Sequence, residues 1–183
     1  NKQIEPVHLQ IVCNRLFKEV RKCYIEQLEA GEIVMIKQKL YEDLGGVEGI
    51  LQGYLQEILN EKFSVRQQQD EVKTILKQMV TSQGTREFRM VIEIAENLSI
   101  KKEKVEEIIQ QLDRSRLIET ISGEDSSQKK YSITHEFLAK QINQWYTLKE
   151  LELKRATEIY ERCLENWNDP KNRSCIPVSY THL

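Results

Sequence analysis

The sequence predicts a mainly α protein: a helical bundle, then a winged helix-turn-helix domain with a small β-hairpin, and a long C-terminal helix. Only three prolines and seven glycines interrupt the 183 residues, and long stretches repeat apolar side chains at helical spacing. Two short segments, 117–121 and 130–134, are instead β-branched or alternate with period two, which is typical of a hairpin. A composition of 39% hydrophobic and 31% charged residues suffices for a packed core.

Residues 1–66 carry two long helical patterns, which predict a helical first domain. Pro6 suits the first turn of a helix, where its missing N–H needs no partner, and an apolar stripe then continues until Gly31. The second pattern contains Gly49 and Gly53, each of which costs about 1 kcal/mol in a helix interior. Two such glycines on one face predict the close approach of another backbone. A packed helix is the default explanation, and a ligand site is the alternative.

A second domain is predicted over residues 67–146, after a polar junction. Three helical patterns come first, and the hairpin and a further helix that Thr134 is expected to cap come after them. Ser99, between the second and third helices, is predicted to be an N-cap or a turn residue. This order of elements is that of a winged helix-turn-helix domain. The three helical patterns cover 69–82, 88–98 and 101–113.

The last helix is expected to continue without a break into residues 147–173, a charged linker helix. Side chains of both signs crowd this segment, which indicates a solvated helix or an interdomain rod, with a coiled coil as the alternative. Residues 174–183 abandon that composition, and we expect them to be an adapter-derived or disordered tail.

Several classes of function are disfavoured by composition and by missing motifs. With 27 Lys plus Arg against 29 Asp plus Glu, the net charge of −2 gives no basic field, so nucleic acid is not an expected partner. No segment is apolar and long enough to cross a membrane. The four scattered cysteines predict reduced, mostly buried thiols in a cytoplasmic protein and no metal site. Phosphate-loop, zinc-protease and nucleophile-elbow motifs are absent, so we expect no catalytic residue and no enzymatic activity in this chain.

Three segments, in this order, resemble one protein family. The first two read IEPVHLQIVC at 4–13 and YEDLGGVEGIL at 41–51. The third combines GTR at 84–86, LI at 117–118 and ITHEFLA at 133–139. The set resembles bacterial STAND ATPases (signal-transduction ATPases with numerous domains) of the novel STAND NTPase 1 type, relatives of the NACHT and NB-ARC switches. The resemblance implies that 1–66 is a helical lid, followed by the winged-helix domain of a nucleotide switch. It also implies that the Walker A and B motifs precede Asn1.

The same resemblance implies two nucleotide-binding residues. His135 stands where relatives have a histidine that reaches the β-phosphate of ADP in the closed state. A helix N-terminus favours an anion, which supports this role, although His135 could instead only cap or pack the helix start. Pro6 resembles the proline that lies against the adenine ring, with helix initiation as the alternative. Glu136 departs from the aspartate that is more familiar at its position, and Arg86 is expected only to form an exposed ion pair.

The main hypothesis is a regulatory fragment of a nucleotide-dependent signal-transduction switch, whose winged helix closes on the nucleotide site and controls activation or assembly. ATP or ADP would bind only to the full-length parent, an ATPase. The implied partners are the N-terminal NTPase core, a C-terminal sensor or repeat domain, and a second copy in a homo-oligomer. One alternative is a DNA-binding transcription regulator, although the lysines of 101–113 alternate with glutamates. The other is a purely structural adaptor.

Overall fold

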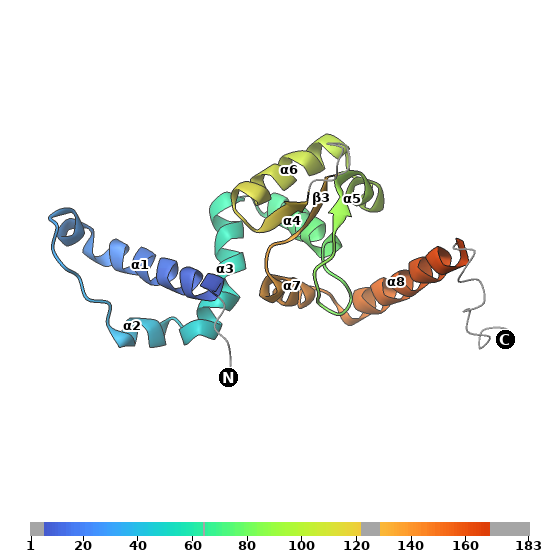
Figure 1. Ribbon diagram of the computed structural model, residues 1–183. Coiled ribbons are helices and arrows are strands. Elements are labelled where there is room, and N and C mark those ends of the chain that lie inside the picture. The colour runs from blue at the N-terminus through green and yellow to red at the C-terminus, as the bar shows by residue number, and fades with distance from the viewer. Residues whose placement is uncertain (1–5, 64, 122–128, 169–183) are drawn as a thin grey trace. The chain divides into compact units, whose positions relative to one another are not determined.

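The computed structural model describes residues 6–63, 65–121 and 129–168 (Figure 1). The chain divides into two compact units, which we call unit 1 (1–69) and unit 2 (70–183). Both are mainly helical, and unit 2 also contains a small antiparallel sheet. The prediction of a mainly α chain with a small β element is therefore confirmed.

Unit 1 is built on two long helices, α1 (Pro6–Glu29) and α3 (Gly46–Lys62), joined through the short helix α2 (Gln38–Asp43). An apolar seam holds α1 against α3, because both helices repeat buried residues at helical spacing. α1 is kinked at Tyr24, where φ is −131° and ψ is 31°. It ends just before Gly31, whose φ of +77° terminates the helix as the sequence predicts. The buried residues of the seam are Ile11, Val12, Val20, Ile50, Leu55 and Leu59.

The two glycines inside α3 have different surroundings, and the prediction made for them is wrong in part. A Cβ built on Gly49 would lie 2.6 Å from the carbonyl oxygen of Leu44, in the turn that precedes the same helix. The close backbone at this position is therefore a turn and not a second helix. A Cβ built on Gly53 meets no atom within 4 Å among the described residues.

Unit 2 places helices around a three-stranded antiparallel sheet of order β1-β3-β2. The fully buried side chains come from both helices and strands, which makes one continuous core; they include Ile75, Leu76, Ile94, Ile109, Leu112, Ile133, Leu138 and Ile142. In chain order the elements are α4 (Arg66–Gln78), β1 (Arg89–Met90), α5 (Val91–Leu98), α6 (Lys102–Arg114), β2 (Ile118–Ile121), β3 (Lys130–Ile133), α7 (Glu136–Asn143) and α8 (Leu148–Asn168). The turn expected between β2 and β3 and the tail expected at 174–183 lie outside the described residues.

Two local predictions in unit 2 need correction, and one pair of alternatives is decided. The helix predicted from residue 88 begins only at Val91, because Arg89 and Met90 pair with β3. Ser99 is the C-cap of α5 with a φ of 53°, which confirms the turn residue of the two alternatives predicted for it. Thr134 does not cap α7, because its hydroxyl donates to the carbonyl of Arg116 at 3.0 Å.

The last helix is interrupted, contrary to the prediction of an unbroken run. α7 ends at Asn143, and α8 starts afresh with Thr147 and Glu150 in a capping box. The Thr147 N–H donates to the Glu150 carboxylate at 2.7 Å, and the Glu150 N–H donates to the Thr147 hydroxyl at 3.3 Å. The Glu150 carboxylate also accepts the Thr147 hydroxyl at 2.9 Å. The bonds that this carboxylate accepts from the Thr147 N–H and hydroxyl, followed by one from Lys77, lower the pKa of Glu150 to about 2.

α8 is exposed along most of its length, but Leu151, Lys154 and Glu158 are half-buried. The Glu158 carboxylate accepts hydrogen bonds from the Ser82 N–H at 2.7 Å and the Ser82 hydroxyl at 2.5 Å. Beside it, the Lys154 side chain is only 14% exposed and its ammonium lies 3.9 Å from Glu87. Burial lowers the pKa of Lys154 and raises the pKa of Glu87.

None of the described helices is long and apolar enough to span a membrane. The thiols of Cys13, Cys23 and Cys163 are free and exposed, which corrects the expectation that most thiols are buried.

Candidate functional site

His135 lies at the junction between β3 and α7, on the surface of unit 2. It is the N-cap residue of α7, with extended backbone angles of −132° and 138°, and its carbonyl accepts the N–H of Leu138 at 3.0 Å. The half-buried imidazole makes no capping hydrogen bond with the helix. Instead its ring stacks on Phe137, with centroids 6.0 Å apart and an interplanar angle of 11°. The geometry thus fixes the ring plane beside the N-terminus of α7.

Arg86 forms hydrogen bonds with the backbone next to His135, a role that the sequence did not indicate. Its Nη1 donates to the Thr134 carbonyl at 3.0 Å and to the Ile133 carbonyl at 3.3 Å. The same guanidinium pairs with Glu119 of β2 at 2.8 Å and with Glu136 of α7 at 3.4 Å. The Arg86 side chain is only 34% exposed, and it binds two backbone carbonyls in addition to its ion pairs, so the expectation of a single exposed ion pair is wrong. It joins the sheet to the start of α7.

The loop that carries Arg86 is itself held in place. The Thr81 N–H donates to the Thr85 carbonyl at 2.9 Å, and the N–H of Gly84 donates back to the Thr81 carbonyl at 2.9 Å. Gly84 has a φ of +74°, and a Cβ there would lie 3.2 Å from the Asn143 side chain. A glycine therefore suits both the turn and the contact with α7.

Replacing Arg86 with leucine should lower the free energy of unfolding of unit 2. We expect a loss of about 1–3 kcal/mol, because charged hydrogen bonds are removed at a site that solvent partly screens. Lysine should restore only part of this, since one ammonium cannot reproduce the planar fork. Urea denaturation followed by circular dichroism measures the change. Arg155→Leu, at an exposed position of α8, is the control, and an equal loss there would contradict the assigned role.

Pro6, the other residue singled out by the sequence, is the first residue of α1 and is exposed. This is the helix position where a proline costs no hydrogen bond. Pro6 belongs to unit 1 and His135 to unit 2.

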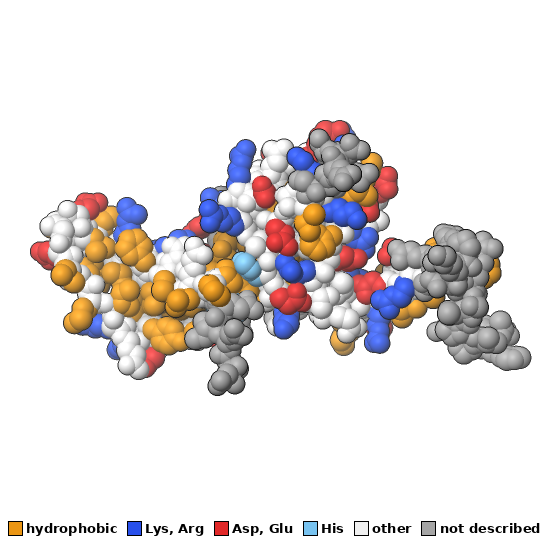
Figure 2. Space-filling view, in the orientation of Figure 1, with side chains coloured by type: hydrophobic (Ala, Val, Ile, Leu, Met, Phe, Trp, Pro, Cys, Tyr) orange, Lys and Arg blue, Asp and Glu red, His pale blue; other side chains and the backbone are white. Residues whose placement is uncertain are grey.

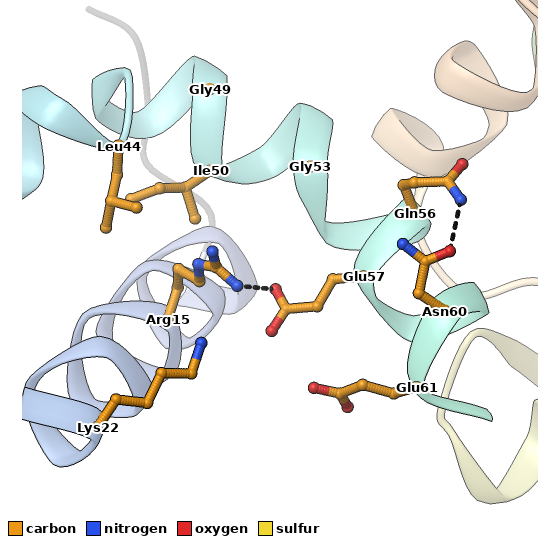
Figure 3. A pocket seen from close by; sticks show the side chains of 10 residues that line it. All are labelled: Arg15, Lys22, Leu44, Gly49, Ile50, Gly53, Gln56, Glu57, Asn60 and Glu61. Atoms are coloured by element: carbon orange, nitrogen blue, oxygen red, sulfur yellow. Dashed lines mark hydrogen bonds and ion pairs between the residues drawn. The ribbon is translucent and has the colours of Figure 1, made fainter. Parts of the chain in front are cut away.

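A cavity of about 520 Å³ lies between α1 and α3 in unit 1 (Figure 3). Gly49 and Gly53 line one wall, and the charged side chains of Arg15 and Glu57 face each other across it. Arg15 and Glu57 form an ion pair at 2.6 Å. Because these charges already satisfy one another, the cavity has the properties of a polar helix–helix interface more than those of an ion-binding site.

Lys18 continues the same polar cluster on α1. Its ammonium lies 2.9 Å from Glu61 and 3.2 Å from Glu57. The hydrogen bond to Glu61 raises the pKa of Lys18, and the same bond lowers the pKa of Glu61. These pairs tie α1 to α3 along one side of the apolar seam.

Unit 1 also exposes many large hydrophobic side chains, and Figure 2 shows them gathered on one face. Each is at least 41% exposed, and Ile33 and Met35 reach 96% and 82%. An apolar surface of this extent is typical of a face that another domain covers. The residues are Leu9, Phe17, Tyr24, Ile25, Ile33, Met35, Ile36 and Val47.

The family model described as Novel STAND NTPase 1 matches residues 9–171, which is most of the chain. A match of this extent defines the class as that of STAND NTPases, whose members are larger multidomain proteins. The chain belongs to the Novel STAND NTPase 1 family. No curated protein and no solved structure matches it.

Proposed function

We propose that this chain is the regulatory part of a nucleotide-dependent signal-transduction switch, in which unit 2 contacts bound ADP through His135 and stabilises a closed state. The observation that carries the proposal is the position of His135 at the N-terminus of α7, half-buried at the surface of unit 2. Membership of the STAND NTPase family supports a regulatory role of this kind.

Unit 2 is, on this proposal, a winged-helix domain. Its elements follow the order helix, strand, helix, helix, strand, strand, from α4 to β3. The first strand pairs with the last, so the sheet order is β1-β3-β2. The segment between β2 and β3, which would form the wing, lies outside the described residues. Both the order and the pairing support the winged-helix assignment.

His135 would act as a phosphate sensor. A ring N–H can donate to a phosphate oxygen, and the adjoining helix N-terminus favours the same negative charge. Because Arg86 holds the Thr134 carbonyl, the backbone that carries His135 is fixed in direction. Because His135 would contact ADP only in the closed state, ADP would bind the closed state more tightly than the open one and shift the equilibrium toward it.

The remaining parts of the switch would lie outside this chain. The apolar face of unit 1 is the surface that we assign to the NTPase core, with Pro6 at the adenine ring, so that unit 1 serves as the lid. ATP or ADP would be bound by the full-length parent, which would be the ATPase, while this chain itself has no catalytic role. A C-terminal sensor domain would follow α8.

A DNA-binding regulator is less well supported, because two of the three lysines of the candidate recognition helix are already paired. Lys104 lies 2.6 Å from Glu71, and Lys102 lies 3.4 Å from Glu106 within α6. These pairs leave α6 without a basic stripe that could follow a phosphate backbone.

Replacing His135 with alanine in the full-length parent tests the proposal. We expect ADP to dissociate about 10- to 100-fold faster, which corresponds to the loss of one hydrogen bond to a charged group. Basal oligomerisation or activity should rise with it. Glutamine, which keeps a donor, should restore part of the ADP retention. The measurement is the release rate of a fluorescent ADP analogue in a stopped-flow instrument.

Lys140→Ala, an exposed residue of the same helix, is the matched control and should leave ADP release unchanged. If His135→Ala retains ADP as the wild type does and assembles no more readily, the sensor role is wrong.

A further inference from the structure

α8 exposes an apolar face from Leu153 onward, beside its contacts with Ser82 and Glu87. Four large side chains on this face are 42–70% exposed, and Ala156 and Cys163 between them are also exposed. A monomer rarely leaves an apolar surface of this kind uncovered. The apolar face of α8 consists of Leu153, Ala156, Ile159, Tyr160, Cys163 and Leu164.

The inward side of α8 differs from that of an ordinary surface helix. Such a helix turns its apolar stripe inward and its charges to solvent. In α8 two charged residues are half-buried along with Leu151: Glu158 is bound to Ser82, and Lys154 lies near Glu87. The larger part of the apolar side chains, from Leu153 onward, is left exposed for another surface.

We propose that the apolar face of α8 docks a second copy of this chain, with the two α8 helices packed antiparallel. Leu153, Ala156, Tyr160 and Cys163 are spaced three, four and three residues apart, which is the a/d repeat of a coiled-coil seam. The same spacing continues to Trp167, which is 54% exposed. A helix with this repeat fits another helix with the same repeat.

The sizes of the seam residues select the antiparallel arrangement. The a positions, Leu153 and Tyr160, are large, and the d positions, Ala156 and Cys163, are small. In a parallel pair, equal residues face each other, so overfilled layers would alternate with empty ones. In an antiparallel pair, Tyr160 faces Ala156 of the second copy, and Leu153 faces its Cys163. Each layer then combines one large and one small side chain.

The charges of α8 favour a helix over a lipid surface as the occupant. Thr157, Ile159 and Leu164, which flank the centre of the seam, carry no charge. Glu152 flanks its first residue, and in an antiparallel pair it faces the position of the uncharged Asn166 of the second copy, so two copies bring no like charges together there. Elsewhere the helix mixes acidic and basic residues in nearly equal numbers. It therefore lacks the basic character of a helix that binds an anionic membrane.

Sedimentation equilibrium of the 183-residue chain over a range of concentrations tests this interface. We expect a monomer–dimer equilibrium in which Ile159→Glu and Tyr160→Glu each raise the dissociation constant at least about tenfold. Ile92→Glu is the matched control, because Ile92 is 49% and Ile159 51% exposed and both lie on helices of unit 2. This variant should dimerise as the wild type does.

A chain that is monomeric at every concentration would overturn the proposal. So would a dimer that is weakened equally by all three variants. Binding of a monomeric chain to vesicles of phosphatidylcholine and phosphatidylglycerol, lost in Tyr160→Glu, would assign the face to a membrane and overturn it as well. None of these outcomes depends on ADP, so the role of His135 is tested separately.

Disulfide trapping tests the orientation. In a chain whose other cysteines are replaced by serine, Leu153→Cys should crosslink to Cys163 of the second copy when diamide oxidises the two thiols. With Cys163 alone, little crosslinked dimer should form. Efficient crosslinking of Cys163 to its own counterpart would indicate a parallel or staggered pair and would overturn the antiparallel arrangement.

Discussion

Replacing Glu158 with alanine should loosen α8 from unit 2 and lower the free energy of unfolding of that unit by about 2–4 kcal/mol. The carboxylate accepts both the N–H and the hydroxyl of Ser82, which is only 6% exposed. Without it, two buried donors lose their partner. Lys154 also loses a neighbouring negative charge that favours its charged form.

Two measurements check this result. Urea denaturation gives the loss of stability, and hydrogen exchange should show faster exchange of the α8 amides. Glu158→Gln, which keeps the shape and one acceptor, should lose less than alanine does. Glu161→Ala is the control, because Glu161 is 48% exposed and lies 3.8 Å from Arg89. If Glu158→Ala and Glu161→Ala change stability equally, the contact with Ser82 does not anchor the helix.

The two interior glycines of α3, Gly49 and Gly53, should respond to alanine in opposite directions. At Gly49 the new methyl group would lie 2.6 Å from the Leu44 carbonyl, so the turn must shift, at a cost of about 1–3 kcal/mol. At Gly53 the methyl group meets nothing within 4 Å among the described residues. There alanine should stabilise the helix by up to about 1 kcal/mol, because it restricts the unfolded chain.

Thermal and urea unfolding of the two variants, measured side by side, test the prediction, and each variant is the control for the other. If both destabilise unit 1 equally, Gly53 also faces a close neighbour in solution. The expected result, a Gly53→Ala chain that is more stable than the wild type, would show that packing within unit 1 does not require a glycine at this position.

The long elements could be predicted from the sequence, because their periodicity is local information. The apolar repeats of α1, α3 and α6 indicate helices, and the patterns at 117–121 and 130–134 indicate the two longer strands. β1 could not be predicted in this way. It has only two residues, and they become a strand because β3 lies beside them.

The break before α8 did have a local signal that was missed. Thr147 and Glu150 stand three residues apart, which is the spacing of a capping box and marks a new helix start. The dense charge around these two residues is also typical of a solvated helix, and this favoured the prediction of one unbroken helix. Which face of α8 turns inward could not be read from the sequence, because Ser82 is 76 residues away from its partner Glu158.

The site could be predicted only in part, for the same reason. Resemblance singles out His135 and Pro6 by their short motifs, and their roles in nucleotide binding stay predictions. The contacts of Arg86 could not be predicted from the sequence, because its partners Glu119, Thr134 and Glu136 are 33–50 residues away and come together with it only in the folded unit.

The polar contact between α8 and unit 2 has a thermodynamic consequence. Detaching a helix that rests on apolar side chains exposes them to water, which raises the heat capacity. The groups of α8 that are half-buried are the Glu158 carboxylate, the Lys154 ammonium and Leu151, so its detachment would hydrate two charged groups and only one apolar side chain. The detachment equilibrium should therefore depend weakly on temperature and strongly on ionic strength. α8 could then act as an arm that salt releases while the rest of unit 2 stays folded.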